Sequence, residues 1–207
     1  ASTPKPSNAH LAGAERLRQL MKQGRILSTL DMKIVNDAGE ELPWDGEAFG
    51  DLKVRGPTVC SAYYGDEPGS ALDEDGWFAT GDVATIDAEG YMEITDRSKD
   101  VIKSGGEWIS SIALENIAVS HPDVLEAAVV AARHPKWDER PLLIVVAKPG
   151  HTIDPADVLK IYEGKVAKWW LPDEVIVVDE LPHTATGKLQ KNTLRDKYRD
   201  RLMAAGE

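Results

Sequence analysis

The first half of the chain alternates apolar and polar residues in short runs, at 32–35, 51–55, 83–86 and 91–94, with glycine-bearing turns such as 87–90. Alternation with a period of two, broken by such turns, is typical of antiparallel strands joined by hairpins. We therefore predict a small antiparallel β unit here. Its candidate core aromatic residues are Trp44, Phe49, Tyr63, Tyr64, Trp77 and Phe78.

A short amphipathic helix is predicted ahead of these strands. Its apolar positions are Leu11, Leu17, Leu20 and Met21. Gly24 follows them, and glycine readily takes the left-handed conformation in which many helices stop. Residues 1–10 are polar, contain proline and show no periodicity, which indicates a loose lead-in.

Beyond residue 108 the pattern changes to helices mixed with continuous apolar runs. The runs at 127–131 and 142–146 do not alternate, which is typical of strands covered on both faces. A further strand is predicted at 174–178. Helices are predicted at 112–118, 155–166 and 192–203, the first with Ser110 or Ser111 as its N-cap.

The predicted fold class is therefore α+β. A small antiparallel, barrel-like β subdomain comes first, then a hinge, then a compact α+β domain with a small mixed sheet. The change of pattern falls at 96–108, which combines charges, a glycine pair and Trp108. Backbone at Gly105 and Gly106 can approach a ligand closely and suits an anion such as phosphate. An ordinary charged linker with a turn is the alternative interpretation.

The net charge of −11 argues against nucleic-acid binding, which needs clustered lysine and arginine. The single cysteine, Cys60, excludes an internal disulfide, and no cysteine–histidine spacing suggests zinc. A reducing cytoplasm is the expected location. No apolar run approaches the roughly 20 residues that span a bilayer, and no signal-peptide core is present.

Two further segments could take part in chemistry. Segment 76–82 ends in Asp82 after a predicted turn, and a carboxylate there could accept both hydrogen bonds of a ribose diol. Segment 181–188 ends in Gly-Lys, and Lys188 could stabilise charge on a phosphoryl group. A solvated turn aspartate and a surface lysine are the simpler alternatives.

Covalent acyl-enzyme chemistry is not indicated. The chain has no nucleophile-elbow serine. Its five histidines are dispersed: His10, His121, His134, His151 and His183.

The order of these features resembles the C-terminal part of the adenylate-forming (AMP-dependent) acyl-CoA synthetases, and most closely the medium- and long-chain fatty-acid–CoA ligases. The resemblance covers nearly all of the chain. It rests on an ordered set of segments: 47–56, 76–82, 96–110, 138–141 and 182–188.

The resemblance implies a role for each matching residue. Asp82 would hold the ribose hydroxyls of ATP or the acyl-adenylate, with Arg97 at the same sugar. Lys99 would be the hinge about which the C-terminal domain rotates. Lys188 would be the catalytic lysine of adenylation, contacting the carboxylate and the α-phosphate. Rotation would then withdraw it before the second half-reaction.

In that thioester step the resemblance implies that Gly105, Gly106 and Glu107 form the loop presented to coenzyme A. Lys103 and Trp108, together with Glu107, would line the nucleotide or the interface between the domains. The implied cofactors are ATP/AMP, coenzyme A and Mg²⁺ bound to ATP, with no metal ligand in this chain. The implied partners are a fatty acid, ATP, coenzyme A and a missing N-terminal domain, without nucleic acid or a membrane span.

Two departures from the family pattern stand out. The family's phosphate loop and its aromatic-Gly-Thr-Glu segment are absent from this chain, so we expect a fragment that is inactive alone. Its expected parts are a lead-in at 1–24, the end of the large adenylation domain at 25–96 and the mobile lid domain at 97–207. Ala113 replaces the acidic residue of a capping box, which should weaken the helix start by up to about 1 kcal/mol.

Two other functions stay open from the sequence. The chain could belong to a ligase for an aryl acid or an amino acid, although segment 107–110 favours fatty acids. It could also be a stand-alone nucleotide-binding or interaction module.

Overall fold

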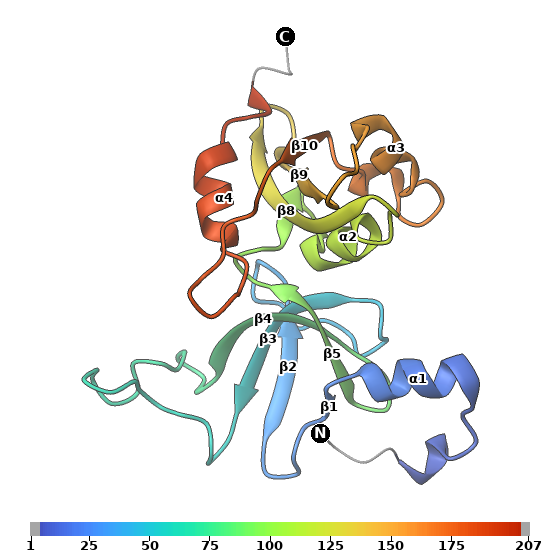
Figure 1. The fold of residues 1–207 in the computed structure, drawn as a ribbon. Helices are drawn as coiled ribbons and strands as arrows, with labels where there is room; N and C mark the ends of the chain where they lie inside the picture. Colours follow the sequence, from blue (N-terminus) through green and yellow to red (C-terminus); the bar gives the residue numbers. More distant parts are fainter. Residues whose placement is uncertain (1–4, 204–207) are drawn as a thin grey trace. The chain divides into compact units, whose positions relative to one another are not determined.

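The computed structural model describes residues 5–203, so residues 1–4 of the predicted lead-in lie outside the described part. The chain divides into two compact units, the first ending at Lys99 and the second beginning at Asp100. The first contains an antiparallel sheet and the second a mixed sheet flanked by helices (Figure 1). The predicted α+β class is therefore confirmed.

The first unit is built on a five-stranded sheet with the order β1-β5-β4-β3-β2. Its elements are a 3₁₀-helix η1 at Pro6–Asn8, α1 at Gly13–Met21, β1 at Gly24–Arg25, β2 at Asp31–Val35, β3 at Phe49–Arg55, β4 at Phe78–Ile86 and β5 at Tyr91–Arg97. All neighbouring strands pair antiparallel. The predicted strands and first helix are confirmed, and β4 and β5 are longer than the sequence pattern indicates.

The core of the first unit lies on one face of this sheet, where alternate residues of the strands are buried. Its buried members are Met32, Ile34, Leu52, Ala84 and Ile86. Trp77 is also buried, and the cationic groups of Lys33 and Arg55 each lie 4.4 Å from the centre of its ring.

The prediction that Trp44, Tyr63 and Tyr64 belong to the core is wrong. Their exposed fractions are 38%, 63% and 108%. All three lie in the long connections on either side of β3 rather than on a strand. Strand alternation therefore does not determine which way their side chains point.

The second unit has a sheet with the order β10-β9-β6-β7, and β8 pairs with β9. Its elements are β6 at Ile102–Ser104, β7 at Glu107–Ile109, α2 at Ser111–Ala118, β8 at Val124–His134, β9 at Asp138–Ala147, α3 at Pro155–Lys160, a 3₁₀-helix η2 at Lys168–Trp170, β10 at Glu174–Val178 and α4 at Lys191–Tyr198. Only the β9–β10 pair is parallel.

The helices of this unit are partly as predicted. Ser110 is the N-cap of α2, because its hydroxyl accepts the Ala113 N–H at 3.2 Å. The helices predicted to reach residues 166 and 203 end earlier, at Lys160 and Tyr198. Gly164, at φ +71°, lies in a left-handed conformation that a helix cannot continue through.

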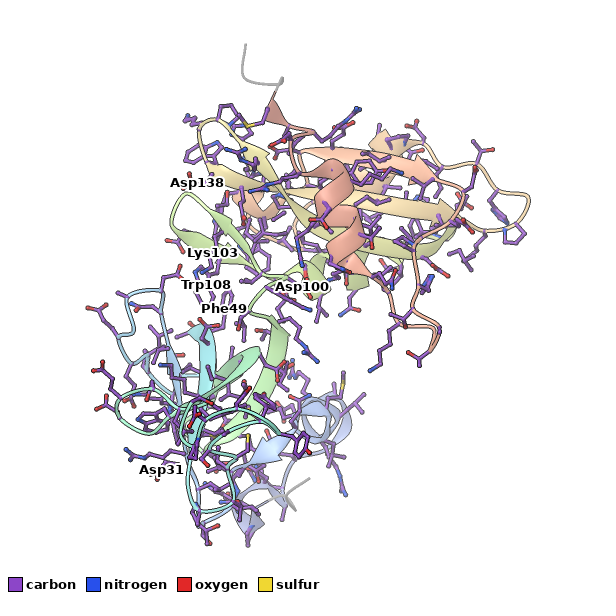
Figure 2. The ribbon with its side chains drawn as sticks, turned by 90° about the vertical axis from the view of Figure 1, so that its left-hand side faces the viewer. Asp31, Phe49, Asp100, Lys103, Trp108 and Asp138 are labelled. Atoms are coloured by element: carbon purple, nitrogen blue, oxygen red, sulfur yellow. The ribbon has the colours of Figure 1, made fainter. Side chains whose placement is uncertain are left out.

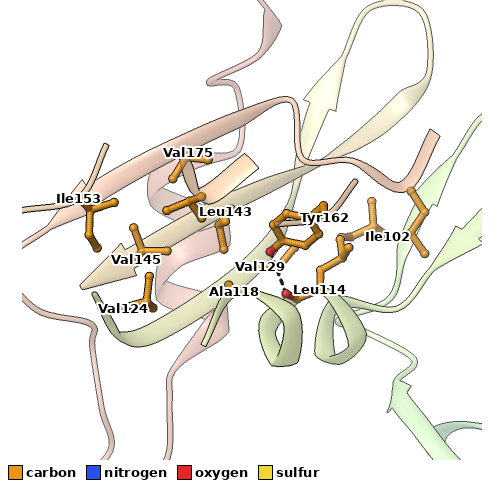
Figure 3. Close-up of a cluster of buried hydrophobic side chains, with 12 residues drawn as sticks. Ile102, Leu114, Ala118, Val124, Val129, Leu143, Val145, Ile153, Tyr162 and Val175 are labelled. Atoms are coloured by element: carbon orange, nitrogen blue, oxygen red, sulfur yellow. Dashed lines mark hydrogen bonds between the residues drawn. The ribbon is translucent and has the colours of Figure 1, made fainter. Parts of the chain in front are cut away.

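Strands β8 and β9 are buried on both faces, as their continuous apolar runs predicted. Val129 and Leu143 face a cluster formed with α2 and the segment around Tyr162 (Figure 3). Their sequence neighbours Val130 and Leu142 face a second cluster formed with α4. Helices α2 and α3 therefore cover one side of the sheet and α4 covers the other.

Tyr162 is fully buried in the first of these clusters, and its side chain is hydrogen-bonded there. Its hydroxyl donates a 2.8 Å hydrogen bond to the carbonyl oxygen of Leu114 in α2. Burial, and then the nearby charge of Glu115, raises the pKa of this hydroxyl above its ordinary value of 10.0. The bond links the segment after α3 to α2.

We expect Tyr162→Phe to lower the free energy of unfolding by about 1 kcal/mol through loss of this hydrogen bond. Because the folded state raises the pKa, the Tyr162 contribution is complete below about pH 10 and declines as the pH rises above it. Urea unfolding across this range should therefore show a steeper alkaline loss for the wild type than for the variant. Tyr63→Phe, at an exposed tyrosine, is the matched control, and equal alkaline losses in wild type and Tyr162→Phe would contradict the expectation.

Candidate functional site

Asp82 and Arg97 form an ion pair across neighbouring strands of the first unit. They are directly paired in the register of β4 and β5, and Arg97 Nε lies 3.1 Å from Asp82 Oδ1. The side chains are 23% and 63% exposed. A single arginine contact at one oxygen leaves a carboxylate able to accept further hydrogen bonds, as a sugar diol would donate.

Asp82 lies within strand β4, whereas the sequence predicted it between a turn and the start of a strand. The turn comes earlier, where the Gly76 N–H donates to the Asp73 carbonyl oxygen, and β4 already begins at Phe78. Gly81, at φ +77°, makes the strand irregular beside Asp82, and its carbonyl accepts the Ser98 N–H at 3.0 Å. The carboxylate is therefore carried by a strand, which holds it more firmly than a turn would.

The backbone on each side of the junction between the units is held within its own unit. Ser98 Oγ donates to Asp51 Oδ1 at 2.5 Å in the first unit. Asp100 pairs with Arg195 of α4 in the second unit (Figure 2). Lys99, which is exposed, lies between these two attachments.

The glycine pair after β6 forms the turn of a hairpin rather than an open loop. Gly105 and Gly106 have φ values of +60° and +89° and connect β6 directly to β7. Lys103 is paired with Trp108 across this hairpin, and its ammonium lies 4.8 Å from the centre of the indole ring (Figure 2). A two-residue turn with both φ values positive strongly favours glycine.

The hairpin is attached to the start of β9 and to Trp137, the residue before it. The Gly105 N–H donates to the Trp137 carbonyl oxygen at 2.9 Å, and the Lys103 N–H donates to Glu139 Oε2 at 2.9 Å. A Cβ atom on Gly105 would lie 2.9 Å from the indole of Trp137, whereas one on Gly106 would meet nothing within 4 Å.

A pocket of about 470 Å³ lies beside this hairpin in the second unit. Its lining consists of Ser104, Gly105, Glu107, Trp137, Arg140, Trp169 and Asp173. Of these, sequence reasoning assigned roles only to Gly105 and Glu107. Arg140 lies in segment 138–141, which contributes to the family resemblance, but the sequence indicated no role for this residue. Trp169 and Asp173 carried no sequence signal because only the fold brings η2 and the residues before β10 to β9.

Lys188 lies in an exposed loop between β10 and α4 that is closed by its own hydrogen bonds. The Thr184 N–H donates to the Lys188 carbonyl oxygen at 2.8 Å, and the Lys188 N–H donates to Thr184 Oγ1 at 3.1 Å. Gly187, at φ +78°, allows the chain to reverse inside the loop. The Lys188 side chain is therefore presented to solvent from a constrained backbone.

The predicted site residues form separate groups within the units. Asp82 and Arg97 are in contact in the first unit, and Lys103 and Trp108 are in contact in the second. The hairpin and the Lys188 loop project from different sides of the second unit. Within residues 5–203 no group of three or more potential metal ligands converges, and no helix has the length and apolarity of a membrane span.

The second unit matches a known family. Residues 113–188 match the AMP-binding enzyme C-terminal domain. The chain is 51% identical over 203 residues to a medium-chain-fatty-acid–CoA ligase of Ectopseudomonas oleovorans, covering 98% of this chain and 37% of that protein. It is 56% identical over 182 residues to a 3-methylmercaptopropionyl-CoA ligase of Ruegeria pomeroyi, covering 87% of this chain and 33% of the relative.

Solved structures agree with these matches. ATP-bound MatB of Rhodopseudomonas palustris is 34% identical, with a TM-score of 0.76 over 88% of this chain and 36% of that one. o-Succinylbenzoate CoA synthetase of Bacillus subtilis, in complex with its acyl-adenylate, is 31% identical, with a TM-score of 0.73 over 87% of this chain and 37% of that one. Residues 113–188 therefore belong to the AMP-binding enzyme C-terminal domain family. Over nearly its whole length the chain is similar to the C-terminal part of CoA ligases, among them medium- and long-chain fatty-acid–CoA ligases, and it spans little more than a third of their length.

The two hairpin glycines should differ in their tolerance of alanine. Both substitutions place a side chain at positive φ, which costs about 1–2 kcal/mol. Gly105→Ala must in addition displace Trp137, so we expect it to destabilise the second unit more than its matched control, Gly106→Ala. Urea unfolding measures the difference, and the indole N–H signal of Trp137 should shift in the NMR spectrum of Gly105→Ala only. Equal destabilisation with an unmoved Trp137 signal would contradict the close packing.

Proposed function

We propose that this chain is the C-terminal part of an ATP-dependent acyl-CoA synthetase acting on a medium- or long-chain fatty acid. The observation that carries the proposal is the 51% identity to a medium-chain-fatty-acid–CoA ligase over 98% of the chain. The ion pair at Asp82, the glycine hairpin and the Lys188 loop all fall within this chain and supply suitable groups. Because the chain spans 37% of that relative, activity is proposed for a longer protein that includes it.

In the first half-reaction an oxygen of the fatty-acid carboxylate attacks the α-phosphorus of ATP, and the bond to pyrophosphate breaks. Asp82 accepts hydrogen bonds from the ribose hydroxyls, and Arg97, which is paired with the Asp82 carboxylate, helps to bind the same sugar. Lys188 contacts the attacking carboxylate and the α-phosphate, where its charge stabilises the transition state. Mg²⁺ enters with the ATP phosphates.

In the second half-reaction the thiol of coenzyme A attacks the acyl carbonyl carbon, and AMP leaves. Gly105, Gly106 and Glu107 form the edge past which the thiol approaches. The absence of side chains at the two glycines permits this close passage. Lys103 and Trp108 line the nucleotide. Lys99 is the hinge that allows the second unit to rotate between the two half-reactions.

A second candidate substrate is a short thioether acid. The 56% identity to a 3-methylmercaptopropionyl-CoA ligase favours it, although over a shorter part of the chain. Initial rates with octanoate and with 3-(methylthio)propionate, measured on the longer ligase, would decide between the two. A higher kcat/KM for octanoate supports the fatty-acid proposal, and the reverse order supports the thioether acid.

Removing the charge of Lys188 should slow adenylation and spare the thioester step. For Lys188→Ala in the longer ligase we expect a loss of about 10²–10³-fold in octanoate-dependent exchange of pyrophosphate into ATP. Conversion of supplied octanoyl-adenylate with coenzyme A should stay at the wild-type rate. Lys197→Ala, at an exposed lysine of α4, is the control. Wild-type exchange in Lys188→Ala would show that the role assigned to Lys188 is wrong.

A further inference from the structure

The side chain of Lys191 is held inside the second unit, three positions after Lys188. Its Nζ lies 2.6 Å from Glu115 Oε1 and 2.8 Å from Ser111 Oγ, both on α2. The Lys191 and Glu115 side chains are only 13% and 15% exposed. Glu115 Oε1 also accepts the Val129 N–H of β8 at 2.8 Å. The ion pair thus fastens the start of α4 to α2 and, through Val129, to β8.

This ion pair stands at the base of the Lys188 loop. The Gln190 N–H donates to the Pro182 carbonyl oxygen at 2.8 Å, which closes the loop immediately before Lys191. Leu181, at the other end of the loop, is buried under α4. The loop can therefore keep its place only while the start of α4 keeps its own. Lys191 and Glu115 fix the position of the start of α4, and hence of the loop, although neither side chain is exposed enough to contact a ligand.

A second ionic anchor supports the glycine hairpin. The Arg140 guanidinium donates to Asp173 Oδ1 at 2.6 and 2.8 Å, and to the carbonyl oxygens of Trp169 at 2.5 Å and Leu171 at 3.0 Å. It also donates to Ser104 Oγ at 3.2 Å, directly before Gly105. Arg140 is 9% exposed, so its charge is committed to protein groups.

The two anchors share no residue and support different segments. Burying a charge is costly unless it is paired and hydrogen-bonded, and removing one partner leaves the other uncompensated. Each anchor is therefore a place where a small chemical change shifts one attached segment. The Lys191–Glu115 ion pair holds the loop that contains Lys188, and the Arg140–Asp173 ion pair holds the hairpin that contains Gly105.

We propose that Lys191 with Glu115 and Arg140 with Asp173 are positioning residues, the first pair for adenylation and the second pair for thioester formation. The inference rests on the proposed function, which assigns those half-reactions to the Lys188 loop and the glycine hairpin. Misplacement of a reacting group by about 1 Å can cost about 100-fold in rate. Each anchor thus controls one half-reaction through the segment it holds.

The test uses the longer ligase that contains this chain and measures each half-reaction separately. Adenylation is followed as octanoate-dependent exchange of pyrophosphate into ATP, and thioester formation as single-turnover conversion of octanoyl-adenylate at saturating coenzyme A. For Lys191→Met we expect about 100-fold slower exchange and an unchanged thioester rate. For Arg140→Lys, which keeps the charge but loses the fork of donors, we expect the opposite pattern.

Further variants separate positioning from stability and from direct binding. Lys191→Arg, which can still reach Glu115, should restore exchange. Lys160→Met, which removes an exposed ion pair on α3, should change neither half-reaction. Thermal unfolding monitors folding of every variant. An Arg140→Lys defect that disappears at saturating coenzyme A, as a higher KM alone, would assign Arg140 to substrate binding and overturn its positioning role.

Two other outcomes would also decide the matter. If the wild type were active but Lys191→Met and Arg140→Lys slowed both half-reactions equally, or slowed neither, the assignment of one half-reaction to each anchor would be wrong. If the wild-type ligase performed neither half-reaction with octanoate or 3-(methylthio)propionate, the proposed function itself would fail and the inference with it.

Discussion

The second unit depends on the pairing of β8 with β9, which extends from Val124–Ala147 to His134–Asp138. Both strands are covered on both faces, so this ribbon is the one element that touches each of the other layers. Burial of apolar area contributes about 25 cal/mol per Å², so a pair of strands buried on both faces stabilises the unit strongly. The helices pack against the two faces of this ribbon, and the functional segments are attached to it.

Each functional segment of this unit is attached to the ribbon by a polar contact near its own base. The Lys188 loop is attached through Lys191 and Glu115 to Val129, and the glycine hairpin is attached through Arg140 and the Gly105 N–H to the start of β9. The tips stay exposed while their bases are buried. An exposed group on a constrained backbone needs little reordering when a ligand arrives, which is the benefit of preorganisation.

The first unit uses a different device to present charge. Asp82 and Arg97 are neighbours only because β4 and β5 pair in a register that is irregular between Val83 and Ala84. The residues on either side of Arg97 are also held in place, Asp96 by burial and Ser98 by its bond to Asp51. Since Asp100 is paired with Arg195 in the second unit, Lys99 is flanked by two fixed neighbours. A change of backbone angle is consequently easiest at that residue, which supports its proposed role as the hinge.

The amino-acid pattern by itself determined the fold class, the strands at 32–35, 51–55 and 174–178, and the buried ribbon, because these depend on local periodicity. It narrowed the N-cap of α2 to Ser110 or Ser111, and the structure decided for Ser110. It also singled out Asp82, Gly105 and Lys188, since their neighbours form recognisable segments. Tertiary structure alone decided the exposure of Trp44 and Tyr64, which lie in connections where alternation has no meaning. It alone paired Lys191 with Glu115 and Arg140 with Asp173, because contacts between residues 76 and 33 positions apart in sequence arise only when helices and strands pack.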